Sequence, residues 1–382
     1  MFAIRAGTIL TPNRILKEAY IAVEDDRIVN VSGEKPKDAR EVYRYDEHIV
    51  SPGFVDIHTH GSFGVDTTYS SSREILDLSK ILPSTGVTSY FPSIMTESPE
   101  QMKDAIRNIR EALESKNNGS SKILGTHLEG PYLNPAMCGA QPKEHIRKPS
   151  LEEFNEFYKL SGGTLKRITV APEIDGGIEF IKDAVRKFEV KVSLGHTDAT
   201  YEQTIKAIEA GASIITHLYN GMRGFHHREP GIVGAALTEN VYVEVIVDFI
   251  HLHPATVNLV MKCKGSNRTI LVTDSISGAG LGDGVYKLGS RAVTIKDGVA
   301  RLSDGALAGS MLTMIGAVQN AVKSGMPLRD AVKMAALTPC NAMGIKDSGK
   351  IVRGCKADFI VLDKQMRITD AFIDGRRCED FS

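Results

Sequence analysis

Several features that mark particular classes of protein are scarce or absent in this sequence of 382 residues. Its five cysteines are scattered and include no Cys-x-x-Cys pair, which favours reduced thiols in a cytoplasm over a disulfide framework. No stretch of about eighteen apolar residues occurs, and the first residues lack the apolar segment of a secretory signal. We therefore expect a cytoplasmic protein that is neither secreted nor inserted in a membrane.

An excess of charge of one sign is also missing. Lys and Arg total 46 against 47 for Asp and Glu, so the formal net charge is -1. No overall field attracts nucleic acid or an anionic membrane, and any binding site for an anion must be local. What is present is an ordinary globular composition, 42% hydrophobic and 24% charged. A chain of this length can bury one large core, or one large and one small core.

The middle of the chain, residues 52–345, alternates short apolar runs with helix-like segments. Helix starts are indicated by Ser98 with Gln101 three residues later, and by Thr200 with Gln203. Eight strands that alternate with helices over roughly 250 residues are typical of a (β/α)₈ barrel, whose active site forms at the C-terminal ends of the strands. An open, doubly wound sheet is the alternative. The eight predicted strands are residues 54–58, 87–91, 123–128, 168–170, 190–194, 213–216, 243–247 and 269–272.

Both ends of the chain show short strands separated by Asn, Asp, Gly and Pro turn residues. Because the two ends share this character and flank a different middle, we expect them to combine into one small unit. The predicted fold is therefore α/β, a (β/α)₈ barrel with a small β-sandwich. The barrel is the catalytic domain, residues 52–345, and the sandwich comprises residues 1–51 and 346–382.

Residues that can bind a metal or move protons stand at the ends of several predicted strands. His58 and His60 are two positions apart on one strand, so both side chains point the same way and can hold one ion. A barrel gathers strand ends on one ring, whereas an open sheet spreads them along an edge, so the barrel explains these positions together. Imidazole and carboxylate ligands without cysteine favour a catalytic divalent ion, zinc or iron in particular, over a closed structural zinc site. The strand-end residues are His58, His60, Glu129, His196, His217 and Asp274.

Five segments, in order along the chain, resemble the motif series of the N-acetylglucosamine-6-phosphate deacetylase family, part of the amidohydrolase superfamily. The resemblance covers nearly the whole chain, including the split β domain. It implies a metal-dependent hydrolase that converts N-acetylglucosamine 6-phosphate to glucosamine 6-phosphate and acetate in amino-sugar catabolism. The segments are HLEGPYLN at 127–134, GHTDA at 195–199, THLYNGM at 216–222, LVTD at 271–274 and LAGS at 307–310.

The resemblance also implies the ligands of one or two divalent ions. Glu129, His196 and His217 match the principal metal ligands of the family. His58 and His60 match a pair that, in members retaining it, helps to hold a second ion. A two-metal site with Glu129 as the bridge is therefore favoured, and the number of ions is left open.

Further roles follow from the same resemblance. Asp274 matches the catalytic aspartate, which takes a proton from the attacking water and later gives one to the departing amine. A basic residue such as Arg228 reaches in from a neighbouring subunit in the family, so a homodimer is expected. Gln141 stands where some members have a histidine that polarises the scissile carbonyl. Since glutamine can donate a hydrogen bond but carries no charge, it either activates or only orients the substrate. The implied substrate-binding residues are Gln141, Asn220, Gly221, Arg228 and His251.

Three alternatives remain open at this stage. A hydrolase of cyclic amides shares the barrel and the His pair, but commonly bridges its metals with a carboxylated lysine where this chain offers Glu129. A deacetylase of N-acetylgalactosamine 6-phosphate differs only in details of the pocket. A non-enzymatic scaffold on the same barrel usually loses ligands, and here all are present. His127, two residues before Glu129, either supports the ligands or has a purely structural role.

Overall fold

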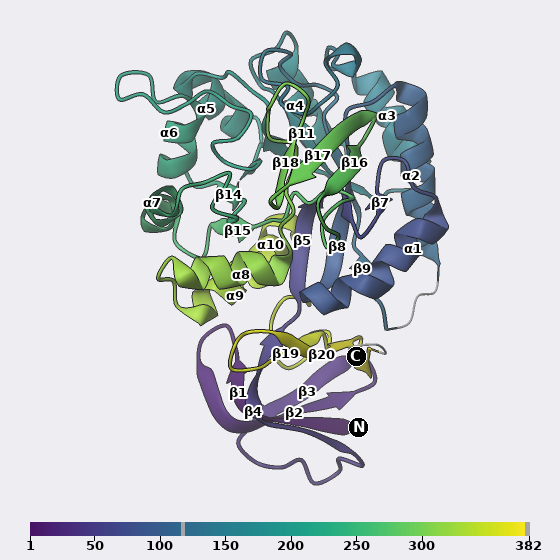
Figure 1. Cartoon of the computed structure of the whole chain (residues 1–382), viewed down its shortest axis with the longest axis vertical. Coiled ribbons are helices and arrows are strands. Elements are labelled where there is room, and N and C mark those ends of the chain that lie inside the picture. The colour runs from purple at the N-terminus through teal and green to yellow at the C-terminus, as the bar shows by residue number, and fades with distance from the viewer. Residues whose placement is uncertain (116–118, 379–382) are drawn as a thin grey trace.

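A barrel of parallel strands forms the larger part of the computed structural model, which describes residues 1–115 and 119–378 (Figure 1). Its strands are β5 (Phe54–Thr59), β8 (Val87–Ile94), β9 (Lys122–Ile123), β10 (Thr126–Glu129), β11 (Leu165–Val170), β12 (Lys191–Leu194), β13 (Ile214–Ile215), β14 (Tyr242–Val245) and β15 (Thr269–Leu271). Eight of them pair in the order β15-β14-β13-β12-β11-β10-β8-β5, and β9 pairs with β8. Near the two outer strands, the Asp274 N–H donates to the His58 carbonyl oxygen at 2.9 Å. The predicted (β/α)₈ barrel is confirmed.

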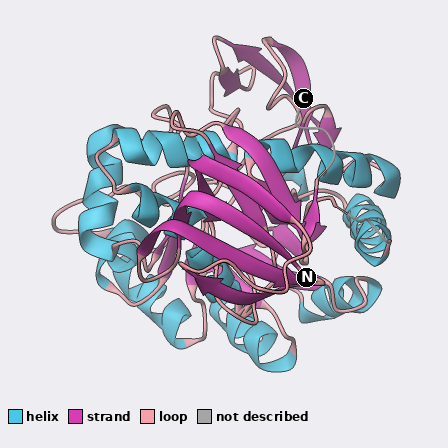
Figure 2. Cartoon of the chain, turned by 90° about the horizontal axis from the view of Figure 1, so that it is seen from below, coloured by secondary structure: helices cyan, strands magenta, loops and turns pink. Residues whose placement is uncertain are grey.

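Helices surround these strands, and in the view from below they lie around the periphery of the molecule (Figure 2). The side chain of Ser98 accepts a hydrogen bond from the Gln101 N–H at the start of α2, and Thr200 and Gln203 form a reciprocal capping box at the start of α5. Both predicted helix starts are confirmed. The helices are α1 (Ser72–Ile81), α2 (Pro99–Glu114), α3 (Leu151–Leu160), α4 (Gly177–Lys187), α5 (Tyr201–Glu209), α6 (Gly231–Thr238), α7 (Pro254–Lys264), α8 (Met314–Lys323), α9 (Leu328–Ala335) and α10 (Leu337–Met343), with 3₁₀ turns at Leu82–Thr85 and Lys143–His145. None of the helices in the described ranges has the length and apolar character needed to cross a bilayer.

One predicted barrel strand differs from the observed one. The run 123–128 is divided into β9 and β10, which are separated by Leu124 and Gly125. β9 pairs with β8, whereas β10 lies between β8 and β11. A Cβ on Gly125 would lie 2.6 Å from Cγ of Lys166, so the backbone passes too close to the neighbouring strand for a side chain. The consequence is that Glu129 ends a short, fully buried strand at the mouth of the barrel.

Strands from both ends of the chain form a separate sheet that also holds both termini (Figure 1). They are β1 (Phe2–Leu10), β2 (Ile15–Glu24), β3 (Arg27–Ser32), β4 (Val42–Pro52), β19 (Phe359–Leu362), β20 (Ile368–Ile373) and β21 (Arg376–Arg377). They pair in the order β21-β20-β19-β4-β1-β2-β3 around an apolar core of their own. The small β unit from both termini is thus confirmed, although β4 was not predicted. The exact domain limits stay a prediction.

A smaller antiparallel sheet, also not predicted, follows the last barrel strand. It consists of β16 (Gly284–Leu288), β17 (Arg291–Lys296) and β18 (Val299–Arg301). These strands lie on the part of the barrel away from the terminal sheet (Figure 1). Leu288, at the end of β16, lines the cleft described below, so this sheet helps to wall the site. A two-stranded ribbon, β6 (Gly61–Ser62) and β7 (Val65–Asp66), follows β5.

Candidate active site

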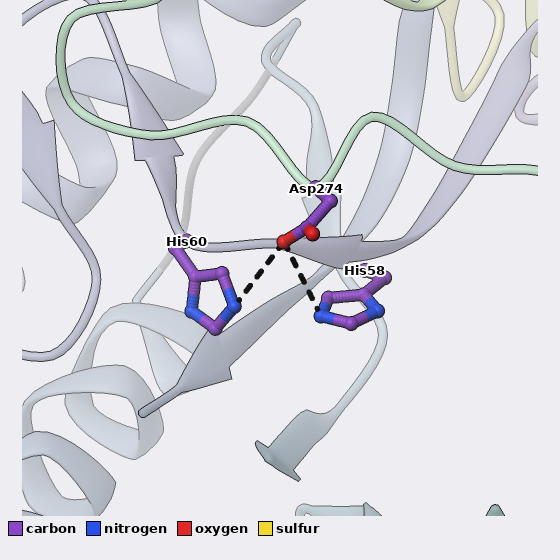
Figure 3. A group of neighbouring side chains, drawn as sticks. All are labelled: His58, His60 and Asp274. Atoms are coloured by element: carbon purple, nitrogen blue, oxygen red, sulfur yellow. Dashed lines mark ion pairs between the residues drawn. The ribbon is translucent and has the colours of Figure 1, made fainter. Parts of the chain in front are cut away.

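The six strand-end residues lie together at the mouth of the barrel and form two groups of three. In each group one ligand atom per residue lies within 4.8 Å of the others. Figure 3 shows the first group, with one oxygen of Asp274 directed at both imidazoles of the His58 and His60 pair. Every member is buried, with at most 8% of its surface exposed. The groups are His58, His60 and Asp274, and Glu129, His196 and His217.

Glu129 stands between the two groups. Its Oε1 lies 3.0 Å from Nε2 of both His196 and His217. The same oxygen is 3.4 Å from Nε2 of His58, while Oε2 is 2.9 Å from Nε2 of His60. One carboxylate therefore faces all four imidazoles, which is the position that a bridging ligand requires.

The four histidine rings face this carboxylate with their Nε2 atoms. In three of them Nδ1 lies against an oxygen acceptor, namely Glu244 Oε2 for His58 at 3.1 Å, the Ser93 carbonyl for His60 at 3.1 Å, and the Met137 carbonyl for His196 at 2.9 Å. In a neutral ring the proton then sits on Nδ1, and Nε2 presents a lone pair. Within the described part of the chain His58 Nε2 has no hydrogen-bond partner, and the Nε2 atoms of His196 and His217 face each other at 3.2 Å. The Nε2 lone pairs of these rings and the oxygens of Glu129 are directed at the same space, an arrangement that suits one or two divalent cations.

The electrostatics of the site point the same way. Burial alone would raise the pKa of the Glu129 carboxyl, but the imidazoles of His58 and His196 hold this pKa well below its ordinary value. Burial opposes a charge on His58, yet Glu129 and Asp274 raise the pKa of its ring well above the usual range. The carboxylates thus require positive charge among them, which protons or metal ions supply.

The backbone is unusual at three of these residues. His196, His217 and Asp274 have φ of 49°, 27° and 47°, the left-handed region that residues with a side chain rarely adopt. Such conformations cluster at functional sites because the surrounding structure must maintain them. Gly221 also has a positive φ of 55°, and a Cβ there would lie 2.9 Å from Nδ1 of His196. Glycine at this position therefore leaves room for the imidazole.

A cleft of about 290 Å³ opens above the two groups. Two of the predicted site residues do not line the cleft. His58 is fully buried beneath its floor. Arg228 is exposed on a loop, where its Nη1 lies 2.8 Å from Nε2 of His227. Within one chain the structure thus does not bring Arg228 to the site. The predicted site residues that do line it are His60, Glu129, Gln141, His196, His217, Asn220, Gly221, His251 and Asp274.

Gln141 is tied to the proposed bridging carboxylate. Its Oε1 accepts a hydrogen bond from the Thr96 N–H at 2.8 Å, which directs Nε2 to donate to Oε2 of Glu129 at 2.6 Å. The side chain is also 2% exposed and lines the cleft. The amide of Gln141 thus positions the Glu129 carboxylate, and its role towards the substrate stays a prediction.

Polar residues below the site were missed by the sequence prediction. Arg167 and Glu244 lie inside the barrel, fully buried, and contact each other. Glu244 is a lone charged residue within an apolar strand segment, and this signal was available in the sequence, whereas Arg167 directly follows Lys166 in β11. His127 lies in the same layer, with Nδ1 2.9 Å from Ser93 Oγ and its ring against that of His58. Burial holds the pKa of His127 well below its usual value, as suits a neutral supporting ring.

Comparisons with known proteins agree with this geometry. A sequence model of the Amidohydrolase family matches residues 49–378. The N-acetylglucosamine-6-phosphate deacetylase of Bacillus subtilis (strain 168) is 38% identical over 372 residues, which cover 96% of this chain and 94% of that protein. An N-acetylgalactosamine-6-phosphate deacetylase of Escherichia coli O157:H7 is 34% identical over 377 residues, 98% of each chain.

Solved structures show the same likeness. The N-acetyl-D-glucosamine-6-phosphate deacetylase of Mycobacterium smegmatis, solved as a mutant in complex with N-acetyl-D-glucosamine-6-phosphate, superimposes with a TM-score of 0.92 at 32% identity and covers 99% of both chains. The N-acetylglucosamine-6-phosphate deacetylase of Thermotoga maritima gives a TM-score of 0.89 at 36% identity, again over 99% of both chains.

Proposed function

Because this chain belongs to the amidohydrolase family, we propose that its site hydrolyses the acetamide of N-acetylglucosamine 6-phosphate, yielding glucosamine 6-phosphate and acetate. The observation that carries the proposal is the Glu129 carboxylate shared by four imidazoles under a cleft, with Asp274 beside them. In this proposal the enzyme is a cytoplasmic homodimer of amino-sugar catabolism and uses one or two divalent ions, with zinc or iron favoured. Residues 52–345 are its catalytic domain.

The residues of the cleft divide the chemistry among them. A bound divalent ion supplies a Lewis acid that lowers the pKa of water and polarises a carbonyl. Asp274 Oδ1 lies 3.5 Å from His58 Nε2 and 3.4 Å from His60 Nε2, so its carboxylate is placed to accept a proton from a water in the cleft. The same carboxyl can then protonate the departing amine, because the two transfers occur in succession.

The rim of the cleft offers groups for the sugar and its phosphate. His251 donates from Nδ1 to Asp248 at 2.6 Å, which leaves Nε2 for a ligand. Asn220 uses its amide nitrogen on backbone carbonyls, the nearer being that of His217 at 3.2 Å, so its oxygen is left as an acceptor. Both residues line the cleft and are proposed to bind the substrate.

An acetate-release assay tests the proposal. We expect the purified protein to release acetate from N-acetylglucosamine 6-phosphate, to lose this activity after treatment with a chelator, and to regain it with zinc or ferrous ion. The likeness to the galactosamine deacetylase of E. coli O157:H7 makes N-acetylgalactosamine 6-phosphate the second candidate, and it is assayed in parallel. No acetate from either sugar phosphate would contradict the proposal. The cyclic-amide alternative is less favoured because Glu129, and not a lysine, lies between the ligand groups.

Arg228 is proposed to bind the substrate phosphate of the neighbouring subunit. A guanidinium suits a phosphate, and this one is exposed outside the cleft of its own chain. We expect Arg228→Ala to raise KM for N-acetylglucosamine 6-phosphate by about tenfold or more, since a charge-assisted hydrogen bond contributes about 1.5–3 kcal/mol. KM for unphosphorylated N-acetylglucosamine should not change. Arg186→Ala, on the outer surface of α4, is the matched control, and equal effects on both sugars would place Arg228 outside the phosphate site.

A further inference from the structure

A buried carboxylate below the cleft has no part in the chemistry described so far. Glu244 lies in the middle of β14, is 0% exposed and does not line the cleft. Its Oε2 accepts two hydrogen bonds from the site, one from Nδ1 of His58 at 3.1 Å and one from the backbone N–H of His217 at 3.2 Å. One oxygen thus contacts a residue of each ligand group.

The other oxygen of Glu244 is occupied by Arg167, which is also 0% exposed. The guanidinium is fixed in turn by Ser193 Oγ at 3.0 Å, Thr216 Oγ1 at 3.2 Å and the Ile57 carbonyl at 3.2 Å. A guanidinium at hydrogen-bond distance stabilises the charged form of a carboxyl group. Glu244 is therefore an ionised group that can only accept hydrogen bonds, and Arg167 fixes its orientation.

We infer that Glu244 is a positioning residue that keeps the proton of the neutral His58 ring on Nδ1, so that Nε2 is the nitrogen that binds the metal ion. The inference rests on the proposed function, because it takes His58 to be a ligand. His58 depends on this contact because, among the residues that the structure describes, its Nε2 has no hydrogen-bond partner, and because its ring is fully buried. Without an acceptor at Nδ1, the proton could move to Nε2 and block coordination.

Replacing Glu244 by glutamine tests this with almost no change in shape. Arg167 has only donors, so the glutamine oxygen must turn toward it, and the glutamine NH₂ group then faces Nδ1 of His58. A donor at that point favours the tautomer with the proton on Nε2. If the glutamine amide turns the other way, its NH₂ group faces the buried guanidinium of Arg167, which is also a donor. Neither orientation of the amide therefore restores the native hydrogen bonds.

The experiment compares zinc affinity in metal-free wild type, Glu244→Gln, His58→Ala and the double variant, titrated against a chromogenic chelator. We expect Glu244→Gln to weaken zinc binding by about 10–100-fold, as supporting residues of metal ligands typically do. The double variant should bind no more weakly than His58→Ala alone, since the inference has Glu244 act on the metal ion through His58. Thermal unfolding of the metal-free proteins shows whether each variant is folded.

Glu97→Gln is the matched control, because Glu97 is 2% exposed and accepts a hydrogen bond from the Ser290 N–H at 2.8 Å without contacting a ligand histidine. Its zinc affinity should stay within about twofold of wild type. If Glu244→Gln does not fold, Glu244→Asp keeps the charge beside Arg167 while withdrawing the carboxylate from His58, and the same non-additivity is expected. Unchanged zinc affinity in a folded Glu244 variant, or additive effects with His58→Ala, would overturn the inference. If His58→Ala itself binds zinc normally, the ligand set of the proposed function is wrong.

Discussion

Asp274→Asn is expected to lower kcat for N-acetylglucosamine 6-phosphate by about 10³-fold, within the range that a general acid–base residue contributes. The amide of asparagine has nearly the same shape but cannot take a proton from water or return one to the amine. Because Asp274 Oδ1 lies 3.4–3.5 Å from the His58 and His60 rings, the substitution removes an ionisable carboxyl group directly beside the metal-ligand candidates. Acetate release measured at saturating substrate gives kcat directly.

Metal analysis of the same variant separates two roles of Asp274. Since Glu129, His196 and His217 form a group without it, we expect the variant to keep at least one equivalent of metal. Asp175→Asn is the control, because Asp175 is exposed and pairs only with exposed Lys148. A variant that retains more than a tenth of wild-type kcat would remove Asp274 from proton transfer, and complete loss of metal would make it an essential ligand instead.

The barrel could be predicted because its signals are local. The capping pairs Ser98 with Gln101 and Thr200 with Gln203 mark helix starts by direct contacts within one turn. Apolar runs of three to six residues mark buried parallel strands, and all eight predicted strands pair in one sheet. The site followed because strand ends meet on a ring, so residues as distant as His58 and Asp274 are brought within 3.5 Å.

The rest depends on contacts that local patterns do not encode. β4 contains Asp46, Glu47 and His48 in its middle, where Asp46 and Glu47 are exposed, and only its last three residues are fully buried. The strands β16 and β17 do alternate exposed with less exposed residues, so their pattern was present in the sequence, and they pack against Met95 and Ile276. β4 is fixed by tertiary contacts, which override a weak local pattern.

The partnership of Arg167 with Glu244 shows the same limit within the site. Glu244 is visible in the sequence as a charge within an apolar strand, which is costly to bury alone. Only the closed barrel shows that the two strands place these charges together and direct the carboxylate at His58. The ligands could therefore be predicted, whereas the group that orients them could not.

Glu129→Gln is expected to have the largest effect on metal binding, because Glu129 is the group that faces all four imidazoles. The substitution removes a negative charge from between the two ligand groups and turns an NH₂ group toward one set of Nε2 lone pairs. We expect less than half of the wild-type metal content after dialysis against metal-free buffer. Activity should fall by about 10³-fold or more, since the loss of several kcal/mol of transition-state stabilisation has that effect.

The metal-free state separates the Glu129 prediction from a folding defect. The amide of the neighbouring Gln141 already accepts from the Thr96 N–H and donates to Glu129, so this buried part of the site accommodates an amide group. We therefore expect metal-free Glu129→Gln to unfold cooperatively, with metal no longer raising its Tm, whereas zinc should raise the Tm of wild type by mass action. A Glu129→Gln enzyme that keeps full metal content and more than a tenth of the activity would show that the two ligand groups do not share this carboxylate, and the bridged arrangement would be wrong.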